Sequence, residues 1–263
     1  MLPETFWGRI QYLLQQYGAS FLSGAGNTMI IAIVGTFLGC LIGFIVGIIQ
    51  TIPVDKRDST AKKTLVGILK FIMACYVEFF RGTPMMVQAM FIYYGSAYLF
   101  NINMSMWFAA FFVVSINTGA YMAETVRGGI LSVDDGQTEA AKAIGMTHVQ
   151  TMMDVILPQA LRNIMPQIGN NLIINIKDTC VLSIIGIVEL FYTTKGVAGA
   201  YYTYFEAFTI AMVMYFILTF VCSRLLRLLE HKMEGPQNYD LATTDTLTHT
   251  SGLYSYPKKK EEK

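Results

Sequence analysis

Two pairs of oppositely charged residues lie in apolar parts of this sequence. Glu78 and Arg81 are three residues apart beside Gly82-Thr83-Pro84, and Lys177 is followed directly by Asp178. Residues three apart share one face of a helix, so Glu78 and Arg81 can form an ion pair that neutralises both charges. The alternative is that these four groups, whose charges sum to zero, bind the carboxylate and the ammonium of a zwitterionic substrate. Charges in apolar surroundings are costly and usually functional.

Two asparagines are expected at the same depth as these charges. Counting inward from Asn163 at 1.5 Å per residue places Asn175 and its charged neighbours about 18–23 Å into their apolar run. Asn117 falls at a comparable depth in another run. The candidates for a substrate path are therefore Glu78, Arg81, Asn117, Asn175, Lys177 and Asp178.

A second functional segment is polar and lies between two apolar runs. Residues 139–145, EAAKAIG, predict a short helix with small side chains, followed nine residues later by VILP at 155–158. Asp134 or Asp135 offers an N-cap, and Gly145 stands where a left-handed C-cap would end the helix. A helix with an alanine face fits a groove of another protein. The alternative is a capped surface helix without a partner.

The composition determines where these segments lie. Hydrophobic residues make up 54% of the 263-residue chain, charged residues only 14%, and the mean hydropathy is +0.46. Soluble domains average about half apolar and a quarter charged residues, so an ordinary soluble domain is excluded and the bilayer is the expected solvent. The four cysteines lie in apolar runs without metal-ligand spacing. No catalytic residue and no metal site are expected.

The distribution of basic residues predicts the topology. They gather in three connections, at residues 56–63, 127–162 and 224–232, whereas 98–105 and 191–206 carry one basic residue between them. By the positive-inside rule, the three basic connections are cytoplasmic and the other two segments are external. The N-terminus is then outside and the C-terminus cytoplasmic.

The number of crossings follows from this topology. Three apolar runs lie between the first two basic connections, although an even number of crossings is required. The sequence Gly82-Thr83-Pro84 interrupts backbone hydrogen bonding. Residues 58–98 are therefore interpreted as one interrupted element whose crossing part starts near Phe71. The expected fold is an all-α polytopic membrane protein with about five transmembrane helices, at residues 28–50, 71–97, 106–126, 163–189 and 207–229.

Three parts of the chain are distinguished. Residues 1–26 suit an amphipathic helix on the outer membrane surface. Residues 27–230 form the transmembrane domain, with a cytoplasmic loop at 127–162. Residues 231–263 are rich in small and polar residues and predict a disordered cytoplasmic tail. The first span also carries a stripe of small residues that lets another helix approach closely, at Gly35, Gly39, Gly43 and Gly47.

Six motifs in one order resemble the permease subunits of bacterial ATP-binding cassette importers, and in particular the branch that carries polar amino acids. Besides the EAA segment at 139–145, the stretches that carry the resemblance are FRGTP at 80–84, NTGAYMAE at 117–124, RGGI at 127–130, LPQA at 157–160 and KDT at 177–179. The resemblance covers about residues 20–230. It implies a MetI-like permease fold in a bacterial cell membrane.

The resemblance also implies partners. The EAA segment would be the coupling helix that docks on a separate ATPase subunit, a second permease subunit would complete the pathway, and an extracytoplasmic solute-binding protein would deliver the amino acid. No P-loop occurs in the chain, so ATP and magnesium are expected on the ATPase and no cofactor or nucleic acid here. The residues implied in coupling are Glu139, Ala140, Ala141, Gly145, Leu157 and Pro158.

A self-sufficient secondary transporter or channel is the alternative. Its ion or proton relay would consist of the charged residues within the membrane. The five expected spans and the lack of an inverted repeat favour the importer.

Overall fold

The computed structural model describes residues 2–54 and 59–234, and no strand occurs among them. The predicted tail at 231–263 lies outside the described residues, apart from the last turn of the final helix. The helices are α1 (Phe6–Thr51), α2 (Thr60–Gly82), α3 (Met85–Phe100), α4 (Met106–Leu131), α5 (Asp135–Ala143), α6 (His148–Gln150), the π-helical η1 (Thr151–Ile156), α7 (Leu157–Asp178), the 3₁₀-helical η2 (Thr179–Ile185), α8 (Leu190–Tyr201) and α9 (Tyr204–Glu234).

The centre of the fold is the contact between α1 and α4. A Cβ atom on Gly39 would lie 2.6 Å from the Cβ of Thr118, and one on Gly47 would lie 2.7 Å from the Cβ of Val126. Only glycine allows the two helices to come this close. The residue numbers of the paired positions increase in the same direction in both helices, so α1 and α4 run parallel. The predicted role of the glycine stripe as a packing surface is confirmed.

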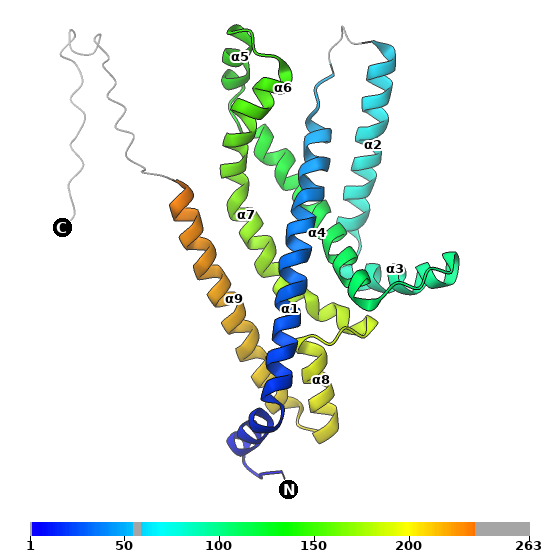
Figure 1. Cartoon of the computed structure of the whole chain (residues 1–263), viewed down its shortest axis with the longest axis vertical. Helices are drawn as coiled ribbons and strands as arrows, with labels where there is room; N and C mark the ends of the chain where they lie inside the picture. Colours follow the sequence, from blue (N-terminus) through cyan, green and yellow to red (C-terminus); the bar gives the residue numbers. More distant parts are fainter. Residues whose placement is uncertain (1, 55–58, 235–263) are drawn as a thin grey trace, which may run out of the picture. The chain divides into compact units, whose positions relative to one another are not determined.

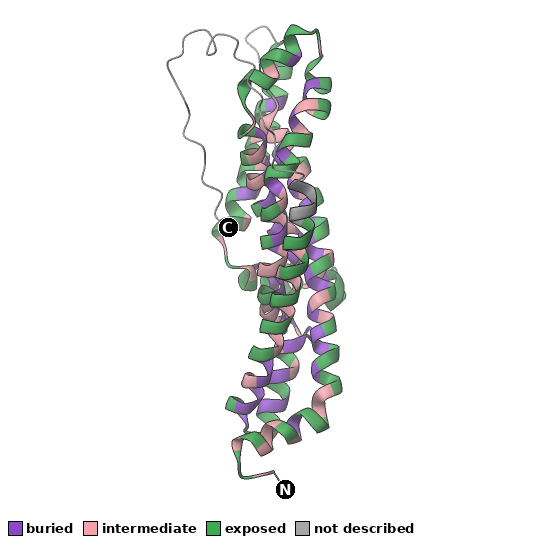
Figure 2. Cartoon of the chain, turned by 90° about the vertical axis from the view of Figure 1, so that its left-hand side faces the viewer, coloured by how far each residue is buried: buried purple, intermediate pink, exposed green. Residues whose placement is uncertain are grey.

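Parallel packing puts the ends of α1 and α4 at the same end of the fold. The C-terminal end of α1, the start of α2 and the segment that contains α5 and α6 therefore lie at the same end of the fold (Figure 1). Beside this pair, α7 packs on both helices through a cluster that includes Cys40, Met122 and Ile164. Figure 2 shows buried positions recurring along these helices among exposed ones, as expected for helices that are apolar on the outside as well as in the core.

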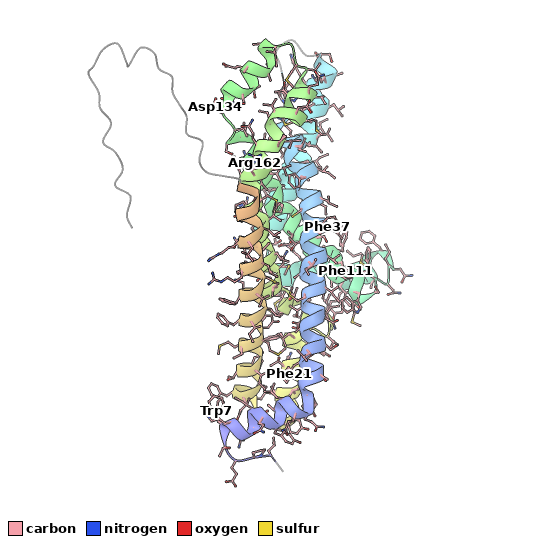
Figure 3. The ribbon with its side chains drawn as sticks, turned by 60° about the vertical axis from the view of Figure 1, so that its left-hand side comes forward. Trp7, Phe21, Phe37, Phe111, Asp134 and Arg162 are labelled. Carbon is pink, nitrogen blue, oxygen red and sulfur yellow. The ribbon has the colours of Figure 1, made fainter. Side chains whose placement is uncertain are left out.

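The N-terminal part of the chain is continuous with the first span. The boundary expected at residue 26 lies inside α1, which is 46 residues or roughly 69 Å long at 1.5 Å per residue. Figure 3 shows the first turns of α1, around Trp7, crossing the direction of the later turns. Phe21 and Leu13 pack in a cluster with Leu190 of α8 and Ala207 of α9. These contacts hold the N-terminal turns against the last two helices.

The second expected span differs from the prediction. The interruption at Gly82-Thr83-Pro84 is present, but α3 turns away from the direction of α2 instead of continuing it (Figure 1). Neither helix is among those long and apolar enough to cross a bilayer. The helix α2 does not qualify as a span because three charged residues, Lys70, Glu78 and Arg81, lie in its apolar part.

Three described helices have the length and composition of a membrane span, namely Phe6–Thr51, Met106–Leu131 and Tyr204–Leu229. They contain the spans expected at 28–50, 106–126 and 207–229. A fourth candidate is the bent pair His148–Ile185 and Leu190–Tyr201.

The fourth expected span, 163–189, is the most altered by the fold. After α7 the chain continues as the 3₁₀ helix η2, which ends at Gly186 in the left-handed conformation, with φ of 89°. The helix α8 then starts at an angle of 56° to the preceding helical segment. The carboxylate of Glu189 caps α8 by accepting the backbone N–H of Tyr192 at 2.6 Å and of Phe191 at 2.8 Å. The segment 191–206, which was expected to be external, is mostly helix, because a buried acidic residue supplies an N-cap inside an apolar run.

Candidate functional site

The helix α5 has well-defined ends. At its start, Oδ1 of Asp134 accepts the backbone N–H of Gly136 at 2.7 Å. At its end, Gly145 has φ of 85°, and the backbone N–H of Met146 donates to the carbonyl of Ala141 at 3.1 Å. This closure is the Schellman motif. Both predicted caps are confirmed, with Asp134 as the N-cap.

The coupling candidates on α5 face in different directions. Glu139 and Ala140 are exposed, whereas Ala141 is buried, with 4% of its surface accessible. The helix packs on η1. Ile144 is 79% exposed at the C-terminal end of the helix. The surface that α5 offers to another protein therefore combines an acidic residue, small side chains and one large apolar residue.

Sequence reasoning missed the apolar members of this surface. Besides Ile144, Val149 is 68% exposed and Met153 is 59% exposed in the following turns. The signal was present in the sequence, because large apolar residues are unusual in a polar segment between spans.

This surface lies at one end of the fold. Asp134, at the start of α5, lies at the opposite end of the fold from Trp7 (Figure 3).

The segment after α5 is braced against the spans. Thr147 and Gln150 form a capping box, in which Gln150 Oε1 accepts the Thr147 backbone N–H at 2.9 Å. Leu157 is partly buried and Pro158 is exposed, and both stand in the first turn of α7, where proline is tolerated. Asn163 Nδ2 then donates to the Ser132 hydroxyl at 3.0 Å, which ties α7 to the end of α4.

The break between α2 and α3 is stabilised by side-chain amides. Pro84 has no backbone donor, so carbonyls at the end of α2 lose their helical partners. Gln88 Nε2 lies 2.8 Å from the carbonyl oxygen of Phe80 and 2.9 Å from that of Thr83. Asn117 Nδ2 donates to Gln88 Oε1 at 3.0 Å. Asn117 therefore connects α4 to the break through Gln88, a residue that was not among the candidates.

A cavity of about 280 Å³ lies beside this break. Three of the six path candidates line it. We call it the polar cavity, and its lining includes Thr83, Asn117, Tyr121, Ile174, Asn175 and Asp178.

Asn175 is a structural residue of this cavity. Its Nδ2 donates to the Thr36 hydroxyl at 2.8 Å and lies 2.9 Å from the Thr118 hydroxyl. All three side chains are buried, at 5% accessibility or less. They join α1, α4 and α7 at one point, so the amide of Asn175 is already satisfied by the protein.

The charges on α2 have a partner that the sequence did not predict. Arg81 forms an ion pair with Glu124 of α4, not with Glu78. Arg127 also approaches Glu124, at 3.6 Å. Glu78 is exposed and lines the same small cavity as these groups. This cavity of about 290 Å³, which we call the charged cavity, is lined by Gln50, Lys70, Glu78, Arg81, Glu124 and Arg127 and two apolar residues.

The second expected pair lies at the end of α7. Lys177 and Asp178 are both exposed, and only Asp178 lines the polar cavity. The six path candidates therefore divide into three groups. Asn117, Asn175 and Asp178 meet at the polar cavity, Glu78 and Arg81 meet at the charged cavity, and Lys177 lines neither.

Comparison with known proteins identifies the family. Residues 60–235 match the family described as "Binding-protein-dependent transport system inner membrane component". This match covers more than half of the chain. The chain belongs to this family. It is a permease, a membrane component of a transport system, as the sequence motifs predicted.

Relatives of this permease have been named for their substrates. The chain is 35% identical over 214 residues to the glutamine transport system permease protein GlnP of Escherichia coli strain K12, covering 81% of this chain and 92% of that one. It is 33% identical over 226 residues to the putative glutamine transport system permease protein GlnP of Rickettsia typhi, covering 85% and 98%.

Solved structures support the same permease fold. An amino acid ABC transporter crystallised with histidines gives a TM-score of 0.73 at 34% identity, covering 83% of this chain and 96% of that chain. The inward-facing MetNI methionine ABC transporter gives a TM-score of 0.68 at 19% identity, covering 83% and 98%, which shows the fold alone. The predicted MetI-like permease fold is confirmed.

Proposed function

We propose that this permease moves a polar amino acid into the cell as part of an ATP-driven importer, with glutamine as the first candidate. The substrate class is supported by the names of the relatives and by the chemistry of the polar cavity. Amide, hydroxyl and carboxylate groups surround that cavity, so a molecule with both charged ends and a polar side chain finds hydrogen-bond partners there.

The observation that carries the proposal is the rigid, exposed helix α5. Its N-cap and Schellman motif fix the helix without help from another chain. Glu139, Ala140 and the 79%-exposed Ile144 then remain available to a partner. An apolar residue held on a rigid helix is a suitable anchor for a groove. We propose the ATPase subunit as that partner, with ATP and magnesium bound there.

The coupling residues divide by task in this proposal. Glu139, Ala140 and Gly145 contact or shape the docking surface. Ala141 holds α5 on η1, and Leu157 with Pro158 begins α7, so a displacement of α5 is transmitted to a helix that lines the polar cavity. A rigid-body movement of α5 then biases the pathway between its two orientations.

The remaining parts of the importer are proposed from the same arrangement. The end of the fold that carries α5 faces the cytoplasm, and the end that carries Trp7 and α8 faces outward, where a separate binding protein delivers the amino acid. A second permease subunit completes the path. Asn117 and Asp178 line that path, and Asn175 fixes its walls.

Transport by reconstituted protein tests this function. The permease is purified with its ATPase and its binding protein and inserted into liposomes, and uptake of radiolabelled glutamine is measured with and without ATP inside. We expect uptake only with ATP and with the binding protein. Competition by unlabelled amino acids defines the substrate class.

Two controls make the result decisive. Empty liposomes and the permease without its ATPase should show no uptake above leakage. Uptake driven by a proton or sodium gradient without ATP would contradict the proposal and favour a secondary transporter. Competition by apolar amino acids alone would retain the importer and reject the polar substrate class.

A further inference from the structure

The polar and charged cavities follow one another along α4. Asn117 and Tyr121 line the polar cavity, whereas Glu124 and Arg127 line the charged cavity. Because α4 runs toward α5, the charged cavity is nearer the end of the fold that carries α5. The opposite direction of α2 agrees with this order, since Thr83 lines the polar cavity and earlier residues of α2 line the charged one.

Three side chains stand between the cavities. The guanidinium carbon of Arg81 lies 5.5 Å from the centre of the Tyr121 ring, a cation–π distance. The same guanidinium pairs with Glu124, one turn further along α4. Tyr121 belongs to the polar cavity, and Arg81 and Glu124 belong to the charged one, so this group is their common wall.

We propose that Arg81, Tyr121 and Glu124 form the inner gate of the substrate path and that the amino acid opens it by exchanging ionic partners. The proposal rests on the proposed function and adds Glu124 and Tyr121 to the residues that handle the substrate. In the closed state the ion pair and the ring separate the polar cavity from the side that carries α5.

Exchange of ionic partners between the gate and the substrate explains why a charged gate suits a zwitterionic amino acid. Breaking the ion pair leaves Arg81 without Glu124 and leaves Glu124 with Arg127, 3.6 Å away, as its remaining partner. An uncompensated charge on Arg81 is unfavourable at membrane depth. A zwitterion removes this cost, because its carboxylate takes the place of Glu124 beside Arg81 and its ammonium takes the place of Arg81 beside Glu124. Every charge keeps a partner while the side chains separate. A molecule that lacks either charge cannot replace both partners of the ion pair, so it does not open the gate.

A purely structural role is the competing explanation. In that case the ion pair only neutralises two charges, and its loss lowers stability without connecting the cavities. The two explanations differ in one observable, which is the access of a reagent from the α5 side to the polar cavity. Ile174 is a suitable reporter position, because it lines the polar cavity and takes no part in the ion pair.

Thiol labelling measures this access. The four native cysteines, Cys40, Cys75, Cys180 and Cys222, are replaced by alanine, and Ile174→Cys is introduced as the only thiol. The permease with its ATPase is studied in inside-out vesicles, in which the proposed topology exposes the α5 side. A charged, membrane-impermeant maleimide is applied, and the labelling rate is measured.

Glu124→Gln should raise the labelling rate at least tenfold over the cysteine parent. The exchange of both charges, Arg81→Glu with Glu124→Arg, is combined with Arg127→Gln, because Arg127 lies 3.6 Å from Glu124 and would repel an arginine there. This variant should return the rate to within about threefold of the parent, because the pair is restored. Lys70→Gln is the matched control, since it removes a charge from the charged cavity but not from the gate, and its rate should stay slow. Co-purification of the ATPase verifies that each variant is assembled.

Two results would overturn the gate. One is an unchanged labelling rate in assembled Glu124→Gln, and the other is equally fast labelling in Lys70→Gln. If Glu124→Gln does not assemble, Tyr121→Ala tests the same wall without removing a charge, and slow labelling there also rejects the gate. Failure of the transport function is recognised separately, because the labelling assay requires no transport and the wild-type uptake assay requires no cysteine.

Discussion

Asn175 of α7 donates a hydrogen bond of 2.8 Å to the hydroxyl of Thr36 of α1, across the centre of the fold. Thr118 of α4 lies at the same point, 2.9 Å from the asparagine amide nitrogen. In the membrane, where water is not available as a replacement partner, such bonds hold helices in one register. The relationship gives Asn175 a structural task next to the polar cavity.

Asn175→Leu should therefore lower stability more than it changes substrate preference. The substitution leaves two buried hydroxyls without their amide partner, and polar contacts between membrane helices are each worth about 1 kcal/mol. We expect a lower thermal midpoint in detergent and an unchanged order of competing amino acids in the residual uptake. An unchanged midpoint together with an altered order would make Asn175 a substrate ligand.

Gly39→Ala should weaken the contact between α1 and α4. A methyl group at this position meets Thr118 at 2.6 Å, and overpacking of this kind costs about 1–3 kcal/mol. Gly26→Ala is the control in the same helix, because no atom lies within 4 Å of its added carbon. The control should be neutral or slightly stabilising, since alanine favours helix. Thermal unfolding of both variants checks the difference, and equal midpoints would reject close packing at Gly39.

Ile144→Glu should release the ATPase from the permease. A charge at this position cannot enter an apolar groove, and the side chain is 79% exposed, so its replacement should leave the packing of α5 on the protein largely unchanged. We expect co-purification of the ATPase and ATP-driven uptake to fall at least tenfold, with normal insertion. Tyr202→Glu, at an 85%-exposed position next to α8, is the control and should retain the ATPase. Normal uptake by Ile144→Glu would exclude α5 as the docking helix.

Glu139→Lys and Gly145→Asp test two further coupling residues. Gly145 has φ of 85°, where a residue with a side chain is strained by about 1–2 kcal/mol. Gly145→Asp should disturb the end of α5, and Glu139→Lys should reverse an exposed charge without disturbing the helix. Both should abolish uptake while leaving insertion intact. Coupled uptake in both variants would mean that this surface does not contact the ATPase.

The proposed topology is tested by labelling from outside. In a protein without its native cysteines, Trp7→Cys and Tyr202→Cys should react with an impermeant maleimide in intact cells, because both positions are exposed. Trp7 (Figure 3) and α8, whose C-cap residue is Tyr202 (Figure 1), lie at the end opposite α5. Gln137→Cys, on α5, should react only after the membrane is opened. Labelling of Gln137→Cys from outside would reverse the orientation.

Several features of this permease follow from the sequence alone. The caps of α5 at Asp134 and Gly145 depend on residues within one helix length, so local preference was enough to predict them. The interruption at Pro84 and the packing stripe around Gly39 are also local, because a missing donor and a missing side chain have the same effect in any fold. The apolar composition determined that the chain belongs in a membrane.

Other features depend on the tertiary structure. The turn of α3 away from α2, the partner of Arg81 and the burial of Ala141 each involve residues far apart in the chain. Sequence spacing favoured Glu78 as the partner of Arg81, because the two share a helical face. Glu124 is the partner because α4 packs beside α2. Charges in a membrane pair with whatever opposite charge the packing places nearest, and only the assembled helices determine which one that is.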